Sequence, residues 1–393
     1  MTTPENHLDA QDMMAQAQTE IGLTDWGGDD FREGLDALLH FCQEQAGLSQ
    51  RGQQHLVNAC VHHLSNRLRI EDLVTRHPEI LEEKVLQPMF LVTFPRSGST
   101  LLHRLLSQDP GIRAPLYGEM WQPAPQVSQE VGKSEREIRM KQADEFFWEP
   151  LDAMFPEGSP ARASIPCAFD AGECYVLFEN SFTCFNYTFD YHIPGYLDWL
   201  SQLDFRPVYA YFKKQLQVLQ WQAPGQPWCM KSADHLLGIE GLLSIFPDAN
   251  LVALHRDPME MVPSLGNLQG CYLDLWREQP MDPKVLGHYC LERYRRIASQ
   301  AATLQDRVDP RQYYAMDYKQ LTANPVEEVK HLMEYFDYPM HPQFATRLEH
   351  WLDANPKPKN RYSLDTYGLG KSEVTESLAT YVYNLRPVDN TPV

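Results

Sequence analysis

The hydrophobic pattern divides the chain into a helical beginning and a longer part in which strands and helices alternate. Between about residues 30 and 86, apolar side chains recur every three or four positions, as at Leu56, Cys60 and Leu64. This spacing is typical of amphipathic helices and predicts an all-helical cap. The polar stretch at residues 1–28 predicts a loose or embracing arm, so we expect residues 1–87 to form an arm and a cap.

From Pro88 onward, short apolar runs of strand length each precede a helical segment. These runs lie at residues 89–94, 228–231, 250–255 and 312–316. Such an alternation predicts an α/β domain over residues 88–355, in which helices cover both faces of a central parallel sheet. Its ligands should bind at the carboxyl ends of the strands. An aromatic-rich insertion at about 140–222 interrupts this alternation of strands and helices. Residues 356–393 are expected to form a tail with a helix near 372–384.

The turn between the first strand and its helix has the composition of an anion-binding loop. It reads Pro95-Arg96-Ser97-Gly98-Ser99-Thr100. Gly98 lets backbone N–H groups approach an anion, the helix N-terminus adds a favourable dipole, and the arginine and hydroxyl side chains add donors. A Walker A loop would carry Lys where Ser99 stands, so a kinase or NTPase is disfavoured. The alternative is an ordinary helix-capping turn.

A second cationic motif follows the strand at 250–255. It reads His255-Arg256-Asp257-Pro258, with Ser264 eight residues after Arg256. An arginine at the carboxyl end of a strand is expected to face the ligand crevice, and a serine on the next helix can bind the same anion. The alternative is a surface Arg–Asp pair ahead of a helix that begins at Pro258.

Together the two motifs resemble those of the sulfotransferases that use 3′-phosphoadenosine 5′-phosphosulfate (PAPS), and most closely the bacterial branch with "PR[ST]G[ST]TLLHRLL". The resemblance covers roughly residues 60–370. It implies a P-loop NTPase-like three-layer fold, PAPS as co-substrate, PAP as product and no metal. It also implies that the loop at 96–100 binds the 5′-phosphosulfate, while Arg256 and Ser264 bind the 3′-phosphate. Arg361, in a tail expected to close over the nucleotide, replaces a further 3′-phosphate loop of the cytosolic relatives.

Transfer of a sulfuryl group to an alcohol needs a base at the acceptor hydroxyl and positive charge near the bridging oxygen. The resemblance implies Glu119 as the base, since several relatives carry a catalytic Glu at this place; the alternative is a capping or salt-bridged Glu. His235 is the second candidate, because cytosolic relatives use a histidine, which titrates near neutrality. Lys231 would stabilise the leaving group or pair with an acid such as Asp234.

The composition of the chain restricts the classes of acceptor that it is expected to bind. The 34 basic and 53 acidic residues give a net charge of −19, which disfavours nucleic acid and heparin-like partners. The eight cysteines form no CxxC pair, no HExxH motif is present, and no signal peptide or long apolar run is found. We therefore expect a cytoplasmic protein that needs no metal. The aromatic insertion predicts an apolar, lipid-like or other small hydroxylated acceptor. The alternatives are a P-loop kinase or nucleotidase and a non-catalytic nucleotide-binding relative.

Overall fold

The sheet at the centre of the fold has four parallel strands in the order β2–β1–β3–β4. The computed structural model describes residues 8–125, 133–157, 159, 161–225, 227–302, 304, 307–355 and 362–383. The strands are β1 (Met89–Leu91), β2 (Cys229–Lys231), β3 (Asn250–His255) and β4 (Tyr313–Asp317). In the middle of the sheet, Phe90 lies beside Met230 of β2 and Leu251 of β3. The predicted α/β class with a parallel sheet is confirmed.

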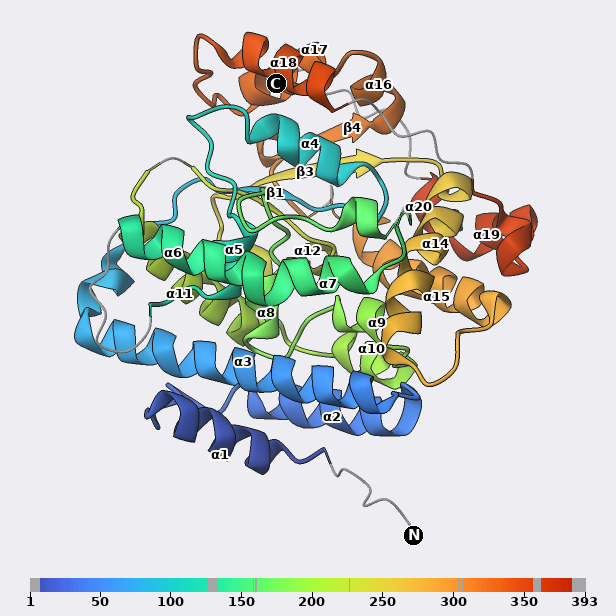
Figure 1. The fold of residues 1–393 in the computed structure, drawn as a ribbon. Helices are drawn as coiled ribbons and strands as arrows, with labels where there is room; N and C mark the ends of the chain where they lie inside the picture. Colours follow the sequence, from blue (N-terminus) through green and yellow to red (C-terminus); the bar gives the residue numbers. More distant parts are fainter. Residues whose placement is uncertain are drawn as a thin grey trace.

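Alternate side chains of the strands enter two different cores, because successive residues of a strand point to opposite faces. Met89 and Leu91 pack in a cluster with α4 (Ser99–Leu106), α17 (Pro325–Tyr335) and α18 (Phe344–Ala354). Phe90 lies in the larger cluster on the other face, to which the cap and the aromatic segment contribute. Helices therefore cover both faces, and the fold has the three layers that the resemblance implied (Figure 1).

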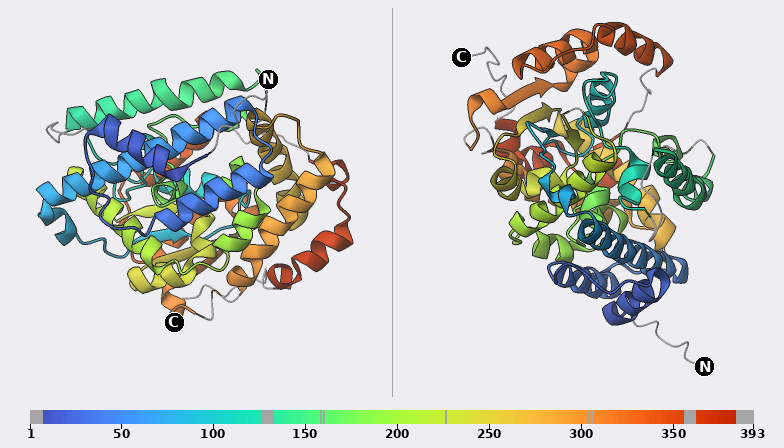
Figure 2. Two further views of the ribbon diagram at one scale, coloured as in Figure 1. Left: turned by 90° about the horizontal axis from the view of Figure 1, so that it is seen from below. Right: turned by 90° about the vertical axis from the view of Figure 1, so that its left-hand side faces the viewer.

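The N-terminal cap consists of α1 (Ala10–Ile21), α2 (Arg32–Gln45) and α3 (Gln50–Arg76). These helices lie at the opposite end of the molecule from α17 and α18 (Figures 1 and 2). Of the two forms predicted for residues 1–28, the described part has the embracing one: α1 is capped by Asp9, buries Met13, Met14 and Ala17, and packs against α3.

The aromatic segment is more regular than its sequence suggested. Most of it is helical: α6 (Lys133–Ala143), a π-helical turn (Asp144–Trp148), α7 (Glu149–Met154), α8 (Tyr175–Glu179), α9 (Tyr187–Asp190), α10 (Pro194–Leu200) and α11 (Arg206–Gln222). Phe178, Phe182 and Tyr196 are almost fully buried in the larger core. Many of these aromatic rings therefore pack the interior rather than line a pocket.

The remaining helices follow the strands or close the chain. They are α5 (Tyr117–Trp121), α12 (Asp234–Leu237), α13 (Ile239–Ile245), α14 (Pro258–Trp276), α15 (Pro283–Ala302), α16 (Tyr318–Ala323), α19 (Lys371–Ser377) and α20 (Ala379–Tyr383). Pro263 lies inside α14 without ending it. The helix expected near residues 372–384 is thus two short helices, α19 and α20. Arg361 lies outside the described residues.

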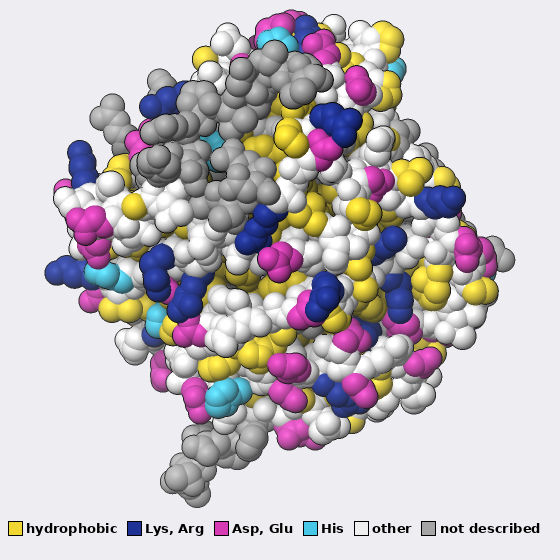
Figure 3. Space-filling view, turned by 180° about the vertical axis from the view of Figure 1, so that it is seen from behind, with side chains coloured by type: hydrophobic (Ala, Val, Ile, Leu, Met, Phe, Trp, Pro, Cys, Tyr) yellow, Lys and Arg dark blue, Asp and Glu magenta, His cyan; other side chains and the backbone are white. Residues whose placement is uncertain are grey.

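The surface opposite the view of Figure 1 carries acidic and basic side chains interspersed with each other (Figure 3). The net negative charge is therefore not gathered into one acidic field on that face. Among the described residues, no helix has the length and apolar character needed to cross a membrane.

Candidate active site

The predicted anion loop connects β1 to α4 at the carboxyl end of the sheet. Arg96 has a φ of 63° and Gly98 a φ of 104°, so two left-handed residues turn the chain sharply into the helix. The first N–H groups of a helix have no partner within it, and at α4 they follow directly on this turn. Thr100 is exposed in the first turn, whereas Ser97 is fully buried and its Oγ finds no hydrogen-bond partner within the described part of the chain.

The second motif lies against this loop. Arg96 Nε donates a hydrogen bond to Ser264 Oγ at 3.1 Å, and Arg256 Nη1 donates to the carbonyl oxygen of Arg96 at 3.0 Å. Arg256 also pairs with Glu260 at 2.8 Å. The two motifs, far apart in sequence, thus form one continuous cationic strip at the strand ends. The sequence predicted both motifs but not this contact between them.

Two tyrosines hold the second motif in place. The Arg256 guanidinium lies 4.3 Å from the centre of the Tyr318 ring, a favourable cation–π contact. Tyr381, in α20, contacts the backbone N–H and carbonyl of Arg256 through its hydroxyl at 3.3 and 3.4 Å. Its ring also lies 4.3 Å from that of Phe94, just before the loop. The C-terminal helices therefore brace the cationic strip.

Replacing Gly98 with Ala should weaken the binding of an anionic ligand to the loop at least tenfold. A Cβ at this position would lie 2.4 Å from the Tyr318 ring, and the φ of 104° is strained for any residue with a side chain. Titration of Gly98→Ala with PAP should show affinity reduced at least tenfold, whereas Gly225→Ala, where no atom lies within 4 Å of the new Cβ, should bind as the wild type does. Equal affinities for both variants would contradict the role of this turn.

A lysine, a carboxylate and a hydroxyl meet beside the loop. Lys231, the last residue of β2, donates from Nζ to Thr100 Oγ1 at 3.1 Å and forms an ion pair with Glu173. The backbone fixes this approach, because Cys174 N donates to the Lys231 carbonyl at 2.9 Å. The Lys231 side chain is 3% exposed, whereas that of Glu173 is 34% exposed, so the carboxylate is the accessible member of the pair. The predicted alternative partner of Lys231, Asp234, instead accepts from Ser232.

Burial lowers the pKa of Lys231, and the negative charge of Glu173 opposes that shift. The pairing compensates for placing an ammonium group in the interior, which is costly when the group has no partner. The ammonium group of Lys231 is therefore held in a fixed position beside Thr100, in the first turn of α4.

Glu119 is buried and bound on both oxygens. Oε1 accepts from the Leu116 N–H at 2.9 Å, and Oε2 lies 3.3 Å from Arg113 Nη2 and 3.1 Å from Arg136 Nε. Burial alone would raise its pKa, but the two guanidinium groups outweigh that effect and lower it. Glu119 thus has the capping and salt-bridged arrangement that was the alternative to the base. A carboxylate held ionised by two arginines is a poor proton acceptor.

His235, the second candidate for the base, lies in the core. Its side chain is fully buried, the ring packs edge-on against Phe90 and Phe178, and Nδ1 lies 2.9 Å from the Tyr209 hydroxyl. Burial lowers its pKa to about 3. A neutral histidine without access to a ligand is unsuited to act as the base.

Sequence reasoning missed Glu173, which belongs to no recognisable motif. A usable signal did exist, because Lys231 ends a buried strand and a buried lysine needs an acidic partner. Which carboxylate fills that role is decided by tertiary structure: Gly172 N donates to the Pro115 carbonyl at 2.7 Å and brings the segment alongside the strand ends.

One aromatic side chain, Tyr117, lies beside Glu173. Burial raises the pKa of Tyr117, the negative charge of Glu173 raises it further, and a hydrogen bond to the Glu173 backbone opposes the shift. Burial and the charge of Asp190 are the larger causes of the raised pKa of Tyr272. The Tyr117 ring packs against Trp148 at 5.2 Å, so one ring of the aromatic segment packs against a tyrosine that contacts Glu173.

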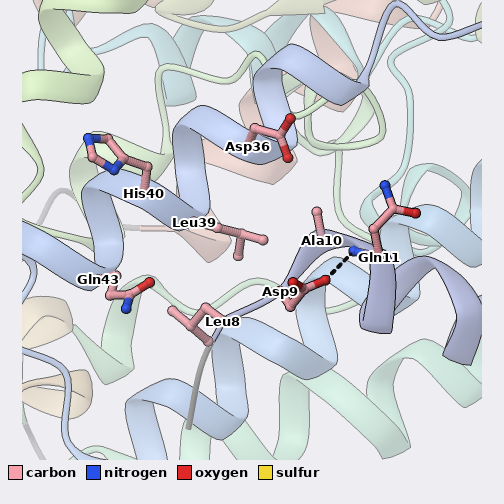
Figure 4. A pocket seen from close by; sticks show the side chains of 8 residues that line it. All are labelled: Leu8, Asp9, Ala10, Gln11, Asp36, Leu39, His40 and Gln43. Carbon is pink, nitrogen blue, oxygen red and sulfur yellow. Dashed lines mark hydrogen bonds between the residues drawn. The ribbon is translucent and has the colours of Figure 1, made fainter. Parts of the chain in front are cut away.

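The pocket between α1 and α2 is unrelated to this site. Figure 4 shows its polar lining, in which Asp9 caps α1 and Asp36 and His40 project from α2. None of the motif residues lines it. Elsewhere in the described ranges, no cluster of three or more His, Cys, Asp and Glu side chains is arranged to hold a metal ion.

The anion loop, the adjoining cationic strip and the Lys231–Glu173 pair thus lie together at the ends of parallel strands, where the ligands of such sheets bind. Residues 88–342 match the sequence model of the Sulfotransferase family, and the chain belongs to this family. It is 25% identical over 299 residues to the omega-hydroxy-beta-dihydromenaquinone-9 sulfotransferase Stf3 of Mycobacterium bovis, with 70% of each protein aligned.

Two crystal structures share the fold over nearly the whole chain. Sulfotransferase STF9 from Mycobacterium avium superposes with a TM-score of 0.86 and 26% identity, covering 98% of this chain and 99% of the other. Sulfotransferase STF1 from Mycobacterium tuberculosis H37Rv gives a TM-score of 0.82 and 25% identity, with 95% and 99% covered. The resemblance to bacterial sulfotransferases is therefore confirmed, and with it the assignment to an enzyme class that transfers sulfate.

Proposed function

We propose that this sulfotransferase moves the sulfuryl group of PAPS to a hydroxyl of an apolar, lipid-like acceptor. The observation that carries the proposal is the cationic strip, which joins the anion loop to Arg256 and Ser264. PAPS has a 5′-phosphosulfate and a 3′-phosphate on one nucleoside, and a strip of this kind suits a ligand with two anionic ends. The nearby Lys231–Glu173 pair supplies the charge and the proton acceptor that the transfer needs.

The nucleotide residues keep the roles implied by their motifs. The 5′-phosphosulfate would bind to the turn formed by Arg96, Ser97, Gly98, Ser99 and Thr100. Because Ser97 Oγ is buried, we assign its contribution to the backbone. Arg256 and Ser264 would hold the 3′-phosphate, and Arg96 would link both ends through its contact with Ser264. Arg361 stays a proposed contact, outside the described part of the chain.

We assign the base to Glu173 in preference to Glu119 and His235. As the acceptor oxygen forms its bond to sulfur, the acceptor proton passes to the Glu173 carboxylate. The bond from sulfur to the bridging oxygen breaks at the same time, and PAP leaves with that oxygen. Lys231 donates a hydrogen bond toward the negative charge that develops on the leaving oxygen. Electrostatic stabilisation of this kind is usually the largest single contribution to catalysis.

The acceptor class rests on the walls of the site. Tyr117 contacts Glu173 and packs against Trp148, and aromatic surfaces of this kind bind flat or chain-like hydrocarbon better than polar groups. The mycobacterial relative is named for a menaquinone-derived lipid alcohol. A small hydroxylated lipid reaching Glu173 with its terminal hydroxyl is consistent with both facts.

Thermal shift measurements with four nucleotides test the donor. PAP and PAPS should each raise the melting temperature, because a ligand that binds only the native state stabilises it by about 2.7 kcal/mol at a hundredfold excess over Kd. ADP should act weakly, since it has no 3′-phosphate, and Arg256→Ala should remove the advantage of PAP over ADP. Stabilisation by ATP with Mg²⁺ but not by PAP would indicate a kinase or nucleotidase and contradict the proposal.

A further inference from the structure

A second pocket lies near the Lys231–Glu173 pair, which is called the transfer site below, and residues of α4, α5, α6 and α18 contribute to its lining. Its volume is about 450 Å³, and neither the anion loop nor the Lys231–Glu173 pair lines it. Three arginines face it, Arg104, Arg113 and Arg136, against two carboxylates, Glu119 and Asp170. The local charge is thus positive in a chain whose net charge is −19.

The arginines differ in how much of their hydrogen-bonding capacity is already used. Arg113 has the most partners: Nη2 binds Glu119 and the carbonyl of Leu219 at 3.1 Å, Nη1 donates to the carbonyl of Ala223, and the guanidinium stacks 3.9 Å from the centre of the Trp228 ring. Arg136 contacts only Glu119, through Nε and Nη2, which leaves Nη1 without a partner among the described residues.

Arg104 is the exceptional member of the group. Its guanidinium donates no hydrogen bond to any residue that the structure describes, and the nearest carboxylate oxygen, on Asp170, lies 3.6 Å away. The side chain is 34% exposed and faces the pocket. A guanidinium fork of this kind is suited to bind a carboxylate, phosphate or sulfate with two parallel hydrogen bonds.

The pocket also offers flat apolar surfaces beside these cations. Trp351, from α18, and Phe169, which is 45% exposed, belong to its lining. Gln108 and Asn355 add neutral polar groups. An oxyanion attached to an apolar or aromatic body would match this combination better than a bare inorganic ion.

Two segments of the chain, α4 and the residues from Asp170 to Glu173, lead from the pocket to the transfer site. Arg104 stands one helical turn after Thr100 on the same face of α4, and its charge contributes to lowering the pKa of Lys231. Asp170 lies in the segment that leads to Glu173, where Tyr117 N donates to the Asp170 carbonyl at 3.1 Å. A molecule with its hydroxyl at Glu173 could therefore place a second group in the pocket.

We propose that this pocket is a binding site for an oxyanion carried on an apolar body, held by Arg104 with help from Arg136. The anion has two possible sources: a group on the acceptor molecule itself, which would deepen the proposed function, or a separate anionic molecule that binds independently of the acceptor. The site as such does not depend on the proposed function.

Calorimetric titration of the PAP-bound protein with phenyl phosphate tests the site without requiring turnover. We expect binding by the wild type, at least tenfold weaker binding by Arg104→Ala, and partial recovery by Arg104→Lys, which restores the charge but not the fork. Arg76→Ala, which removes a similarly exposed arginine from α3, should bind as the wild type does. Equal affinity for wild type and Arg104→Ala would overturn the proposal, as would loss of binding in Lys231→Met alone, which would place the anion in the transfer site.

A comparison of two acceptors identifies the source of the anion. One acceptor carries a carboxylate, and the other carries the methyl ester of that carboxylate. If the acceptor supplies the anion, Arg104→Ala should reduce the preference for the carboxylate form, as a ratio of kcat/KM values, by at least tenfold. An unchanged ratio, together with the loss of phenyl phosphate binding, identifies a separate anion. Absence of turnover with either acceptor would count against the proposed acceptor class and leave the titration result standing.

Discussion

Replacing Glu173 with Gln should lower kcat roughly 10²–10⁴-fold, the usual contribution of a general base. The amide has the size of the carboxylate but cannot take the acceptor proton. The affinity for PAP should stay within about twofold of wild type, because the nucleotide contacts are on the loop and on Arg256 and Ser264. Steady-state kinetics with PAPS and a hydroxylated lipid, together with PAP titration, measure both quantities.

Glu327→Gln is the matched control for this experiment. Glu327 also forms an ion pair with a lysine, Lys330 at 3.1 Å, but on the exposed surface of α17. Loss of that pair should leave kcat unchanged, since surface pairs contribute little and this one is remote from the loop. A Glu173→Gln enzyme that turns over at the wild-type rate would show that another group takes the proton.

The anion loop was predictable because its parts are contiguous. A buried strand, a left-handed Gly98 and a helix start within a dozen residues fix the geometry of the turn, whatever the rest of the chain does. The second motif was predictable for the same reason, since Arg256 directly follows β3. The contact between Ser264 of this motif and Arg96 was not predictable. It depends on the pairing of β1 with β3 and on where α14 places Ser264.

The transfer residues depend on tertiary packing, and sequence reasoning failed there. Glu173 reaches Lys231 only because the segment before α8 is hydrogen-bonded to the end of β2. His235 follows that same strand, but α12 directs it back among Phe90 and Phe178. Position in the chain placed only His235 near a strand end, and the packing instead brings Glu173 to the end of β2.

Replacing Glu119 with Gln should instead lower the free energy of unfolding at neutral pH by about 3–5 kcal/mol. Removing one partner from a buried ion pair leaves an uncompensated charge, and here two guanidinium groups, of Arg113 and Arg136, lose their only shared carboxylate. Urea denaturation measures the loss. Glu327→Gln should change the same quantity by less than about 0.5 kcal/mol, because its carboxylate is exposed.

The pH dependence gives the same experiment an independent readout. Because the pKa of Glu119 in the folded protein lies below its ordinary value of 4.5, its ion pairs contribute fully above about pH 5. The contribution is lost as the pH falls through the lowered pKa, so the wild type should lose its advantage over Glu119→Gln only in acid. A Glu119→Gln protein as stable as the wild type at neutral pH, with kcat reduced a hundredfold, would return the role of base to Glu119. The opposite pair of results, a slow Glu173→Gln that still binds PAP and an unstable Glu119→Gln that still transfers sulfate, would separate the proton acceptor from the carboxylate that holds Arg113 and Arg136.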